Sequence, residues 1–302
     1  MDLQKTYLAI DAGGTFFKSA LLNASGEVIN GSAHLERSYS EGPADKVVGA
    51  YRNTVSNALR YVGEHGGLEL IGIGIATPGP FDYENGVPLM KHKFASVYGV
   101  RLRDVIYEIP GVQVDLPISF MHDANAALAG EILNGNAKRY SNAALITLGT
   151  GLGFAFSQNS KVQFNEQGGP QITIFKEPYQ DGILEDYVSK RGILRIYKEK
   201  SGKSDIDHIQ VADIGKLANE GDEIGLDTFR EAGKILAVNI KPILKEQKIE
   251  CLLFGGQISK SFHHFEEIVK SELDDVQTLR NIAVVSNMDN AALIGALWKL
   301  LG

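Results

Sequence analysis

The segment LAIDAGGTFFKSALLNASGEVI, residues 8–29, contains the pattern that decides the fold. An apolar run ends in one acid, passes through a glycine turn and continues as a second apolar run. The polar and turn residues of this segment are Asp11, Gly13, Gly14, Thr15 and Lys18. Dense apolar residues on both sides of the turn predict two buried strands, and the NASG turn predicts a third strand by residue 32. A simple hairpin requires neither the acid nor the paired glycines, so we expect this turn to bind a ligand.

A second segment repeats the pattern in the other half of the chain. Residues 142–163, NAALITLGTGLGFAFSQNSKVQ, again predict strand, glycine and threonine turn, strand, polar turn and strand. Repetition of one unit in both halves indicates a duplicated α/β fold. Glycine turns expose backbone N–H groups to an anion, so two such turns are suited to a polyphosphate. Either turn taken alone is explained equally well as a tight hairpin.

Composition restricts the class of protein. A chain of 302 residues with 44% hydrophobic and 22% charged residues is typical of a soluble protein with two domains. The net charge of −7 argues against nucleic-acid binding. The absence of a long apolar run or signal segment predicts a cytoplasmic protein without membrane contact. The single cysteine, Cys251, excludes an internal disulfide and is expected to be a buried apolar residue.

The remaining segments predict further helices and strands. Apolar residues at helical spacing predict a helix over residues 43–65, followed by the strand LELIGIGIAT and a loop with two prolines. ILEDYVSKRGILRIYKE and VADIGKLANEG predict helices, and residues 223–248 predict a long one that Pro242 is expected to kink. IECLLFGG and NIAVVS predict strands, and NAALIGALWKLL predicts a final amphipathic helix.

Two acids stand at positions suited to chemistry. Asp123 ends the strand PISFMH and precedes a helix, and ligands of α/β sheets bind at the carboxyl ends of strands. We interpret Asp123 as a general base, although an N-cap is the alternative. Asp11 is suited to Mg²⁺, which combines one or two carboxylates with phosphate oxygens. Lys18 is expected either to neutralise phosphate charge or to remain solvated.

Five stretches, in this order, resemble the motifs of the ROK family of bacterial sugar kinases and repressors, within the actin and hexokinase ATPase superfamily. They are DAGGT from Asp11, GIATPGP from Gly74, HDANAALAGE from His122, LGTGLG from Leu148 and LLFGGQIS from Leu252. The resemblance implies an α/β protein of two ribonuclease H-like, actin-like ATPase domains around an ATP cleft. It implies a small domain over residues 1–121, rejoined by the C-terminal helix 289–302, and a large domain over residues 122–288.

The resemblance also implies an activity: phosphorylation of a hydroxyl, O6, of a hexose or hexose derivative by Mg·ATP in a homodimer, with Asp123 as the base. The implied ATP and phosphate site comprises Asp11, Gly13, Gly14, Thr15, Lys18, Thr150, Gly151, Gly255 and Gly256, with Mg²⁺ at Asp11. The implied sugar site comprises Gly79, His122, Glu166 and Glu185. For His122 the alternative to a sugar contact is a histidine buried beside the helix start. For Glu166 and Glu185 the alternative is that they are ordinary surface acids.

Departures from the family pattern concern the sugar. His122 replaces an asparagine, Gly169 replaces a histidine, and Lys93 lies near the position of another asparagine. The cysteine-rich loop is absent, so structural zinc is not expected. A β-glucoside, a disaccharide, N-acetylmannosamine or N-acetylglucosamine is therefore an alternative to glucose.

Two alternatives to an enzyme follow from the same family. One is a sugar-sensing repressor, which is expected to carry a helix-turn-helix module ahead of the first glycine turn. Here the segment with that turn already starts at Leu8. The other is a protein that binds sugar or nucleotide without turnover, which the retained Asp11, Thr15, Asp123 and Thr150 argue against.

Overall fold

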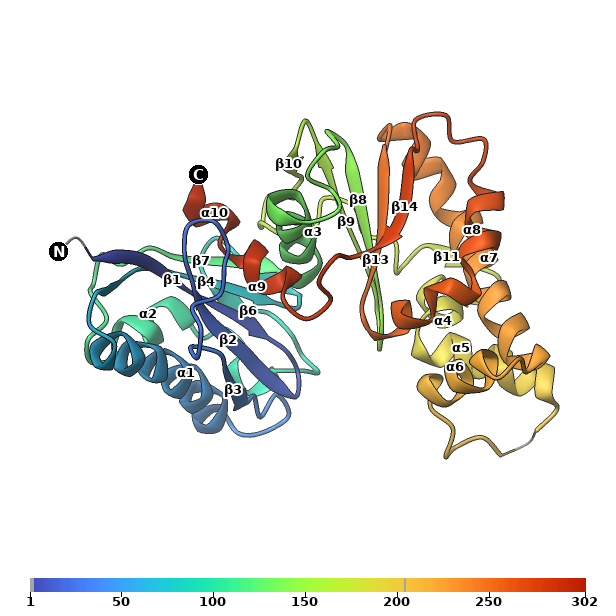
Figure 1. Cartoon of the computed structure of the whole chain (residues 1–302). Helices are drawn as coiled ribbons and strands as arrows, with labels where there is room; N and C mark the ends of the chain where they lie inside the picture. Colours follow the sequence, from blue (N-terminus) through green and yellow to red (C-terminus); the bar gives the residue numbers. More distant parts are fainter. Residues whose placement is uncertain (1–2, 204) are drawn as a thin grey trace. The chain divides into compact units, whose positions relative to one another are not determined.

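The computed structural model describes residues 3–203 and 205–302, and its compact parts are two units (Figure 1). Unit 1 contains the chain up to Lys138, the segment Phe164–Gln171 and the C-terminal segment Asp289–Gly302. Unit 2 contains Arg139–Gln163 and Ile172–Met288. The C-terminal segment therefore belongs with the N-terminal part of the chain. Unit 1 also includes the helix after residue 121, where the sequence prediction placed the start of the second domain.

The sheet of unit 1 has the strand order β3-β2-β1-β4-β7. Its strands are β1 (Gln4–Ala12), β2 (Phe16–Leu22), β3 (His34–Arg37), β4 (Leu68–Thr77) and β7 (Ile118–His122). β2 pairs with β1 and β3 in antiparallel fashion, whereas β1, β4 and β7 are parallel. The carboxyl ends of the three parallel strands therefore meet at one edge of the sheet.

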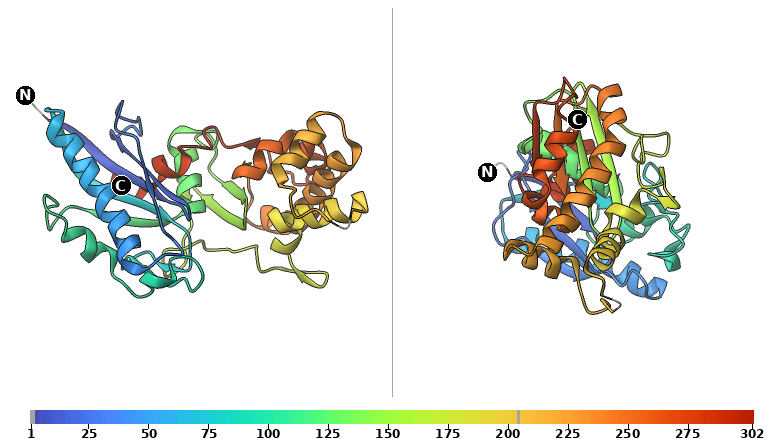
Figure 2. Two further views of the ribbon diagram at one scale, coloured as in Figure 1. Left: turned by 90° about the horizontal axis from the view of Figure 1, so that it is seen from below. Right: turned by 90° about the vertical axis from the view of Figure 1, so that its right-hand side faces the viewer.

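Helices cover both faces of this sheet (Figures 1 and 2). On one face lie α1 (Ala44–Glu64), α2 (Leu102–Tyr107) and the short helix η1 (Ala95–Val97), and their apolar residues pack on the sheet in one core cluster. On the other lie α3 (Asp123–Asn134), α9 (Ala291–Ala296) and α10 (Trp298–Leu301). Leu293 and Leu297 pack on Ala9, Ala20 and Leu22. The small hairpin β5 (Phe81–Asp82) and β6 (Val87–Pro88) follows β4.

The contact between α3 and α9 depends on glycines. A Cβ at Gly295 would lie 1.7 Å from the Ala126 carbonyl oxygen, and a Cβ at Gly130 would lie 2.1 Å from the Ala291 carbonyl oxygen. No larger residue fits these distances without displacement of a backbone, because real Cβ contacts are far longer. The two helices therefore pack backbone against backbone.

The sheet of unit 2 repeats that of unit 1, with the strand order β10-β9-β8-β13-β14. Its strands are β8 (Ala143–Leu148), β9 (Leu152–Gln158), β10 (Lys161–Val162), β13 (Cys251–Gly255) and β14 (Asn281–Val284). The first three are antiparallel neighbours, and β8, β13 and β14 are parallel. The same order and the same directions in both sheets confirm the predicted duplicated α/β fold.

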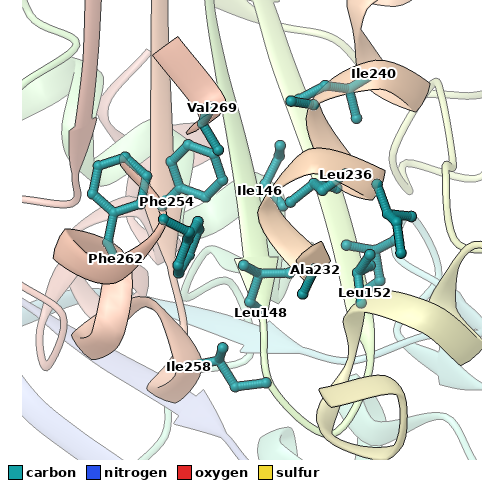
Figure 3. Packing of buried hydrophobic residues seen from close by; sticks show 14 of the residues in the cluster. Ile146, Leu148, Leu152, Ala232, Leu236, Ile240, Phe254, Ile258, Phe262 and Val269 are labelled. Carbon is teal, nitrogen blue, oxygen red and sulfur yellow. The ribbon is translucent and has the colours of Figure 1, made fainter. Parts of the chain in front are cut away.

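The helices of unit 2 follow its first three strands. They are α4 (Glu185–Val188), α5 (Lys190–Ser201), α6 (Val211–Asn219), α7 (Glu223–Glu246), η2 (Gln257–His264) and α8 (Glu266–Glu272), with the hairpin β11 (Pro178–Tyr179) and β12 (Gly182–Ile183) before α4. Figure 3 shows Leu236 and Ile240 of α7 packed with Ile146 of β8 and Phe254 of β13. Pro242 lies inside α7.

Three predictions of local structure differ from the structure. The third strand lies at His34–Arg37 instead of ending by residue 32, where Val28 forms only an isolated bridge with Leu22. The expected helix from Ile183 is two helices separated at Ser189, whose backbone is extended. The C-terminal helix is likewise divided after Ala296 into α9 and α10.

Candidate active site

The carboxyl ends of β1, β4 and β7 bring together the candidate residues of unit 1. Asp11 on β1 pairs in register with Ala76 on β4, and Thr77 on β4 pairs with His122 on β7. Asp123 follows His122 as the first residue of α3. Ligands of α/β sheets bind at such an edge. Residues far apart in sequence thus share one site.

The two carboxylates of this site interact. Burial and, to a smaller extent, the negative charge of Asp123 together raise the pKa of Asp11 to about 6, against the opposing effect of Lys18. An acid whose charge is disfavoured by burial and by a second acid attracts a divalent cation, and Mg²⁺ takes one or two carboxylates together with phosphate oxygens. The donor set therefore fits Mg²⁺ at Asp11. Among the described residues no cluster of three or more histidines, cysteines and acids could hold a metal ion on its own.

The raised pKa of Asp11 predicts a pH-dependent stability. Because its pKa is about 6 in the folded chain and 3.8 in the reference state, its proton stabilises the fold fully below about pH 4, and this contribution is lost as pH rises through about 6. Without Mg²⁺, we expect Asp11→Asn to raise the free energy of unfolding at pH 8 by roughly 2 to 3 kcal/mol, and by little at pH 4. Denaturant titrations at both pH values measure this.

Two controls accompany the measurement. Mg²⁺ with a nucleotide is expected to stabilise the native chain more than Asp11→Asn, since the carboxylate binds the ion. Asp115→Asn removes an exposed acid and is expected to leave the stability unchanged at either pH. Equal stability of Asp11→Asn and the native chain at pH 8 would contradict the burial of this charge.

The first glycine turn, residues 13–15, connects β1 to β2. A Cβ at Gly13 would lie 2.9 Å from the Phe16 carbonyl oxygen, so the turn requires glycine there. The hydroxyls of Ser38 and Ser40 donate hydrogen bonds to the Gly14 carbonyl oxygen, which fixes the turn. Thr15, the last residue of the turn, is exposed.

Two lysines lie near this turn. The Lys18 ammonium donates a hydrogen bond to the Asp289 carbonyl oxygen at 2.6 Å, so it joins β2 to the C-terminal segment. It also lowers the pKa of Asp11. Lys93 lies against the turn, because a Cβ at Gly14 would lie 3.6 Å from its Nζ atom. Both can offset phosphate charge.

The N-cap of α3 is His122, so the alternative of Asp123 as the N-cap is wrong, and Asp123 is the first residue of the helix. The Asp123 Oδ1 atom accepts a hydrogen bond from the Ala124 N–H at 2.7 Å. The His122 Nδ1 atom accepts from the same N–H at 3.2 Å and lies 3.0 Å from Asp123 Oδ1. The Asp123 side chain is 46% exposed, so its carboxylate also remains accessible to a substrate.

A tyrosine that sequence reasoning missed lies beside these residues. Tyr83 is 3% exposed, and its phenol donates a hydrogen bond to the Thr77 carbonyl oxygen at 3.3 Å. Its ring contacts that of His122 edge to face at 6.0 Å, and a Cβ at Gly79 would lie 3.0 Å from its hydroxyl. Glu166 is exposed. The segment that carries it contacts the rest of unit 1 through a hydrogen bond from the Tyr83 N–H to the Gln167 carbonyl oxygen. No motif in the sequence signals this contact.

Unit 2 contains the second glycine turn, residues 149–151, and the glycine pair of residues 255 and 256. β8 and β13 are parallel neighbours, and Thr147 lies opposite Gly255. Thr150 and Gly151 follow the end of β8, and Gly256 follows Gly255, the last residue of β13. The resemblance implies that all four belong to the ATP and phosphate site. Gly256 has φ +84°, and a Cβ there would lie 2.4 Å from the Leu148 carbonyl oxygen. Gly255 and Gly256 thus lie beside β8, the strand that leads into Thr150 and Gly151.

Glu185 also lies at the second turn. Its Oε2 atom accepts a hydrogen bond from the Leu152 N–H at 2.9 Å, and its Oε1 atom pairs with Arg191 at 2.8 Å. Its side chain is 20% exposed. The carboxylate thus anchors the residue after the turn, and its role as a sugar ligand stays a prediction.

Comparisons with known proteins agree with this architecture. The family model described as "ROK family" matches residues 7–301 of this chain. A glucokinase of Halalkalibacterium halodurans is 28% identical over 97% of this chain and 94% of its own length. A xylose repressor of Bacillus spizizenii is 23% identical over 88% of this chain and 68% of its own.

A solved structure shows the same fold. It is a ROK family glucokinase from Streptomyces griseus in complex with glucose and AMPPNP, with a TM-score of 0.77 and 20% identity, covering 96% of this chain and 97% of that one. Among the helices of residues 3–203 and 205–302, none combines the length and apolarity that a membrane span requires. The match to nearly the whole chain shows that this protein belongs to the ROK family.

Proposed function

We propose that this chain is an ATP-dependent carbohydrate kinase, a phosphotransferase with an alcohol acceptor. It transfers the γ-phosphoryl group of Mg·ATP to a hydroxyl, O6, of a hexose or hexose derivative. The observation that carries the proposal is the meeting of Asp11 and Asp123 beside a glycine turn at the carboxyl ends of β1 and β7. Similarity to a glucokinase along nearly the whole chain supports it.

Each group at this edge has a task in phosphoryl transfer. Asp123 accepts the proton of the attacking hydroxyl, for which its exposed carboxylate is available. Asp11 holds Mg²⁺, which when bound neutralises charge on the phosphate oxygens. The N–H groups of Gly14 and Thr15 in the first turn bind phosphate oxygens, and Lys18 and Lys93 offset their charge.

The remaining predicted residues complete the proposal. Thr150 and Gly151 bind phosphate oxygens of ATP, and Gly255 and Gly256 allow close approach of the adenosine. Gly79, His122, Glu166 and Glu185 are proposed to contact the sugar. A homodimer is proposed from the family alone.

A panel of sugars tests the activity. ADP release is measured with glucose, β-glucosides, disaccharides, N-acetylmannosamine and N-acetylglucosamine, and kcat/KM is compared among them, because specificity is a ratio of these values. We expect at least one sugar to raise ADP release by the native chain and not by Asp123→Asn. Release that no sugar raises above the rate of this variant would contradict a kinase.

A second candidate is a sugar-sensing regulator. The similarity to a xylose repressor over 88% of this chain favours it. Calorimetric titration separates the two functions: a regulator binds sugar without phosphorylating it, whereas a kinase does both. Specific DNA binding at physiological salt would support the regulator.

A further inference from the structure

We propose that Tyr83 forms part of the acceptor subsite, where its phenol binds a sugar hydroxyl and its ring fixes the residues around Asp123. The inference rests on the proposed function. Tyr83 follows β5 and belongs to none of the motifs that predicted the site. It is a positioning and specificity-determining residue that sequence and comparisons do not assign.

Tyr83 connects three separate segments of unit 1. Toward β4, its hydroxyl donates a hydrogen bond to the Thr77 carbonyl oxygen at 3.3 Å, and a Cβ placed at Gly79 would lie 3.0 Å from that hydroxyl. Toward β7, its ring contacts the His122 ring, whose Nδ1 atom is 3.0 Å from Asp123 Oδ1. The side chain therefore spans the carboxyl ends of two parallel strands.

The third segment is the loop that carries Glu166. The Tyr83 N–H donates a hydrogen bond to the Gln167 carbonyl oxygen at 3.0 Å. A Cβ at Gly169 would lie 3.4 Å from the Tyr83 ring, and a Cβ at Gly168 would lie 3.0 Å from the Tyr83 Cβ. The two glycines of the loop therefore pack against the Tyr83 side chain. Tyr83 fills the space beside them and fixes the loop relative to His122.

The phenol keeps capacity for a ligand. A tyrosine hydroxyl has one donor and two acceptor lone pairs, and its contact with Thr77 uses the donor at a long distance. Burial, together with the charge of Asp123, raises the Tyr83 pKa well above its usual range, so the group stays a neutral phenol. When one sugar hydroxyl donates its proton to Asp123, the neutral Tyr83 phenol can accept a hydrogen bond from a neighbouring hydroxyl of the same sugar.

Tyr83→Phe removes the hydroxyl and keeps the ring. We expect the Kd for the sugar, measured by calorimetry, to rise about 3- to 10-fold, as loss of one neutral hydrogen bond does. The Kd for ATP is expected to stay unchanged. Tyr107→Phe is the matched control, because its phenol also donates to a carbonyl oxygen, that of Leu116, outside the site.

Tyr83→Leu removes the ring as well. The kcat/KM is expected to fall about 100-fold, because misplacement of the Glu166 loop and His122 by about 1 Å suffices for such a loss. The order of preference among sugars is expected to change. A proportional fall for all sugars with unchanged KM values would assign Tyr83 a packing role only and overturn the inference.

The outcomes separate the inference from the proposed function. Absence of turnover with every sugar contradicts the kinase, while the calorimetric comparison of the native chain with Tyr83→Phe still tests the subsite. An unchanged sugar Kd in Tyr83→Phe overturns the inference even if the chain is an active kinase. Absence of sugar binding by the native chain overturns it too.

Discussion

Replacement of Asp123 by asparagine is expected to lower kcat about 10²- to 10⁴-fold, the range associated with loss of a general base. The amide cannot accept the proton of the attacking hydroxyl. Its oxygen can still accept the hydrogen bond from the Ala124 N–H, so α3 keeps its start. We therefore expect KM for both substrates and the Tm to change little. Steady-state kinetics and thermal unfolding of the purified variant measure these quantities.

Asp115→Asn is the matched control for this prediction. Asp115 is an exposed acid just ahead of β7, the strand that ends at His122. The same change of chemistry there is expected to leave kcat unaltered. A kcat of Asp123→Asn close to that of the native chain would remove Asp123 from the reaction.

The largest expected effect on stability belongs to Gly295. Gly295→Ala places a methyl group 1.7 Å from the Ala126 carbonyl oxygen and 2.6 Å from the Gly130 N atom, both backbone atoms of α3. Because α3 has to move, we expect a loss of about 3 kcal/mol or more in the free energy of unfolding, at the upper end of overpacking effects. Denaturant titration measures this loss.

Gly49→Ala in α1 is the control. Apart from its chain neighbours and the backbone of its own helix, no heavy atom of the described residues lies within 4 Å of a Cβ placed at Gly49, so only helix propensity changes. A gain of about 0.5 to 1 kcal/mol is expected, because glycine disfavours a helix interior by that amount relative to alanine. Similar effects of the two substitutions would contradict backbone-to-backbone packing of α3 and α9.

The strands and the glycine turns could be predicted from the sequence because their signals are local. Apolar runs around Gly13–Gly14 and around Gly149–Gly151 predict hairpins from neighbouring residues alone. The helical spacing that ends near Glu64 predicted α1 in the same way. The parallel pairing of β1, β4 and β7 then follows from the repeated α/β order.

What the sequence could not predict depends on contacts between distant segments. Tyr83 meets Gly169 because the segment after β10 returns to unit 1, and no local pattern records that return. The break between α4 and α5 at Ser189 could not be predicted either, because the helical spacing of apolar residues continues through both helices. A Cβ at Gly192 would lie 2.1 Å from the Tyr187 carbonyl carbon, a tight bend that only the packed chain reveals.

Identification of the product tests the central claim most directly. The native chain and Asp123→Asn are incubated with Mg·ATP and the sugar that raises ADP release most, and phosphorus NMR identifies the product. We expect a sugar 6-phosphate from the native chain, in an amount equal to the ADP formed, and almost none from Asp123→Asn. ADP accompanied by inorganic phosphate alone, or equal sugar phosphate from both proteins, would contradict phosphoryl transfer to a sugar by Asp123.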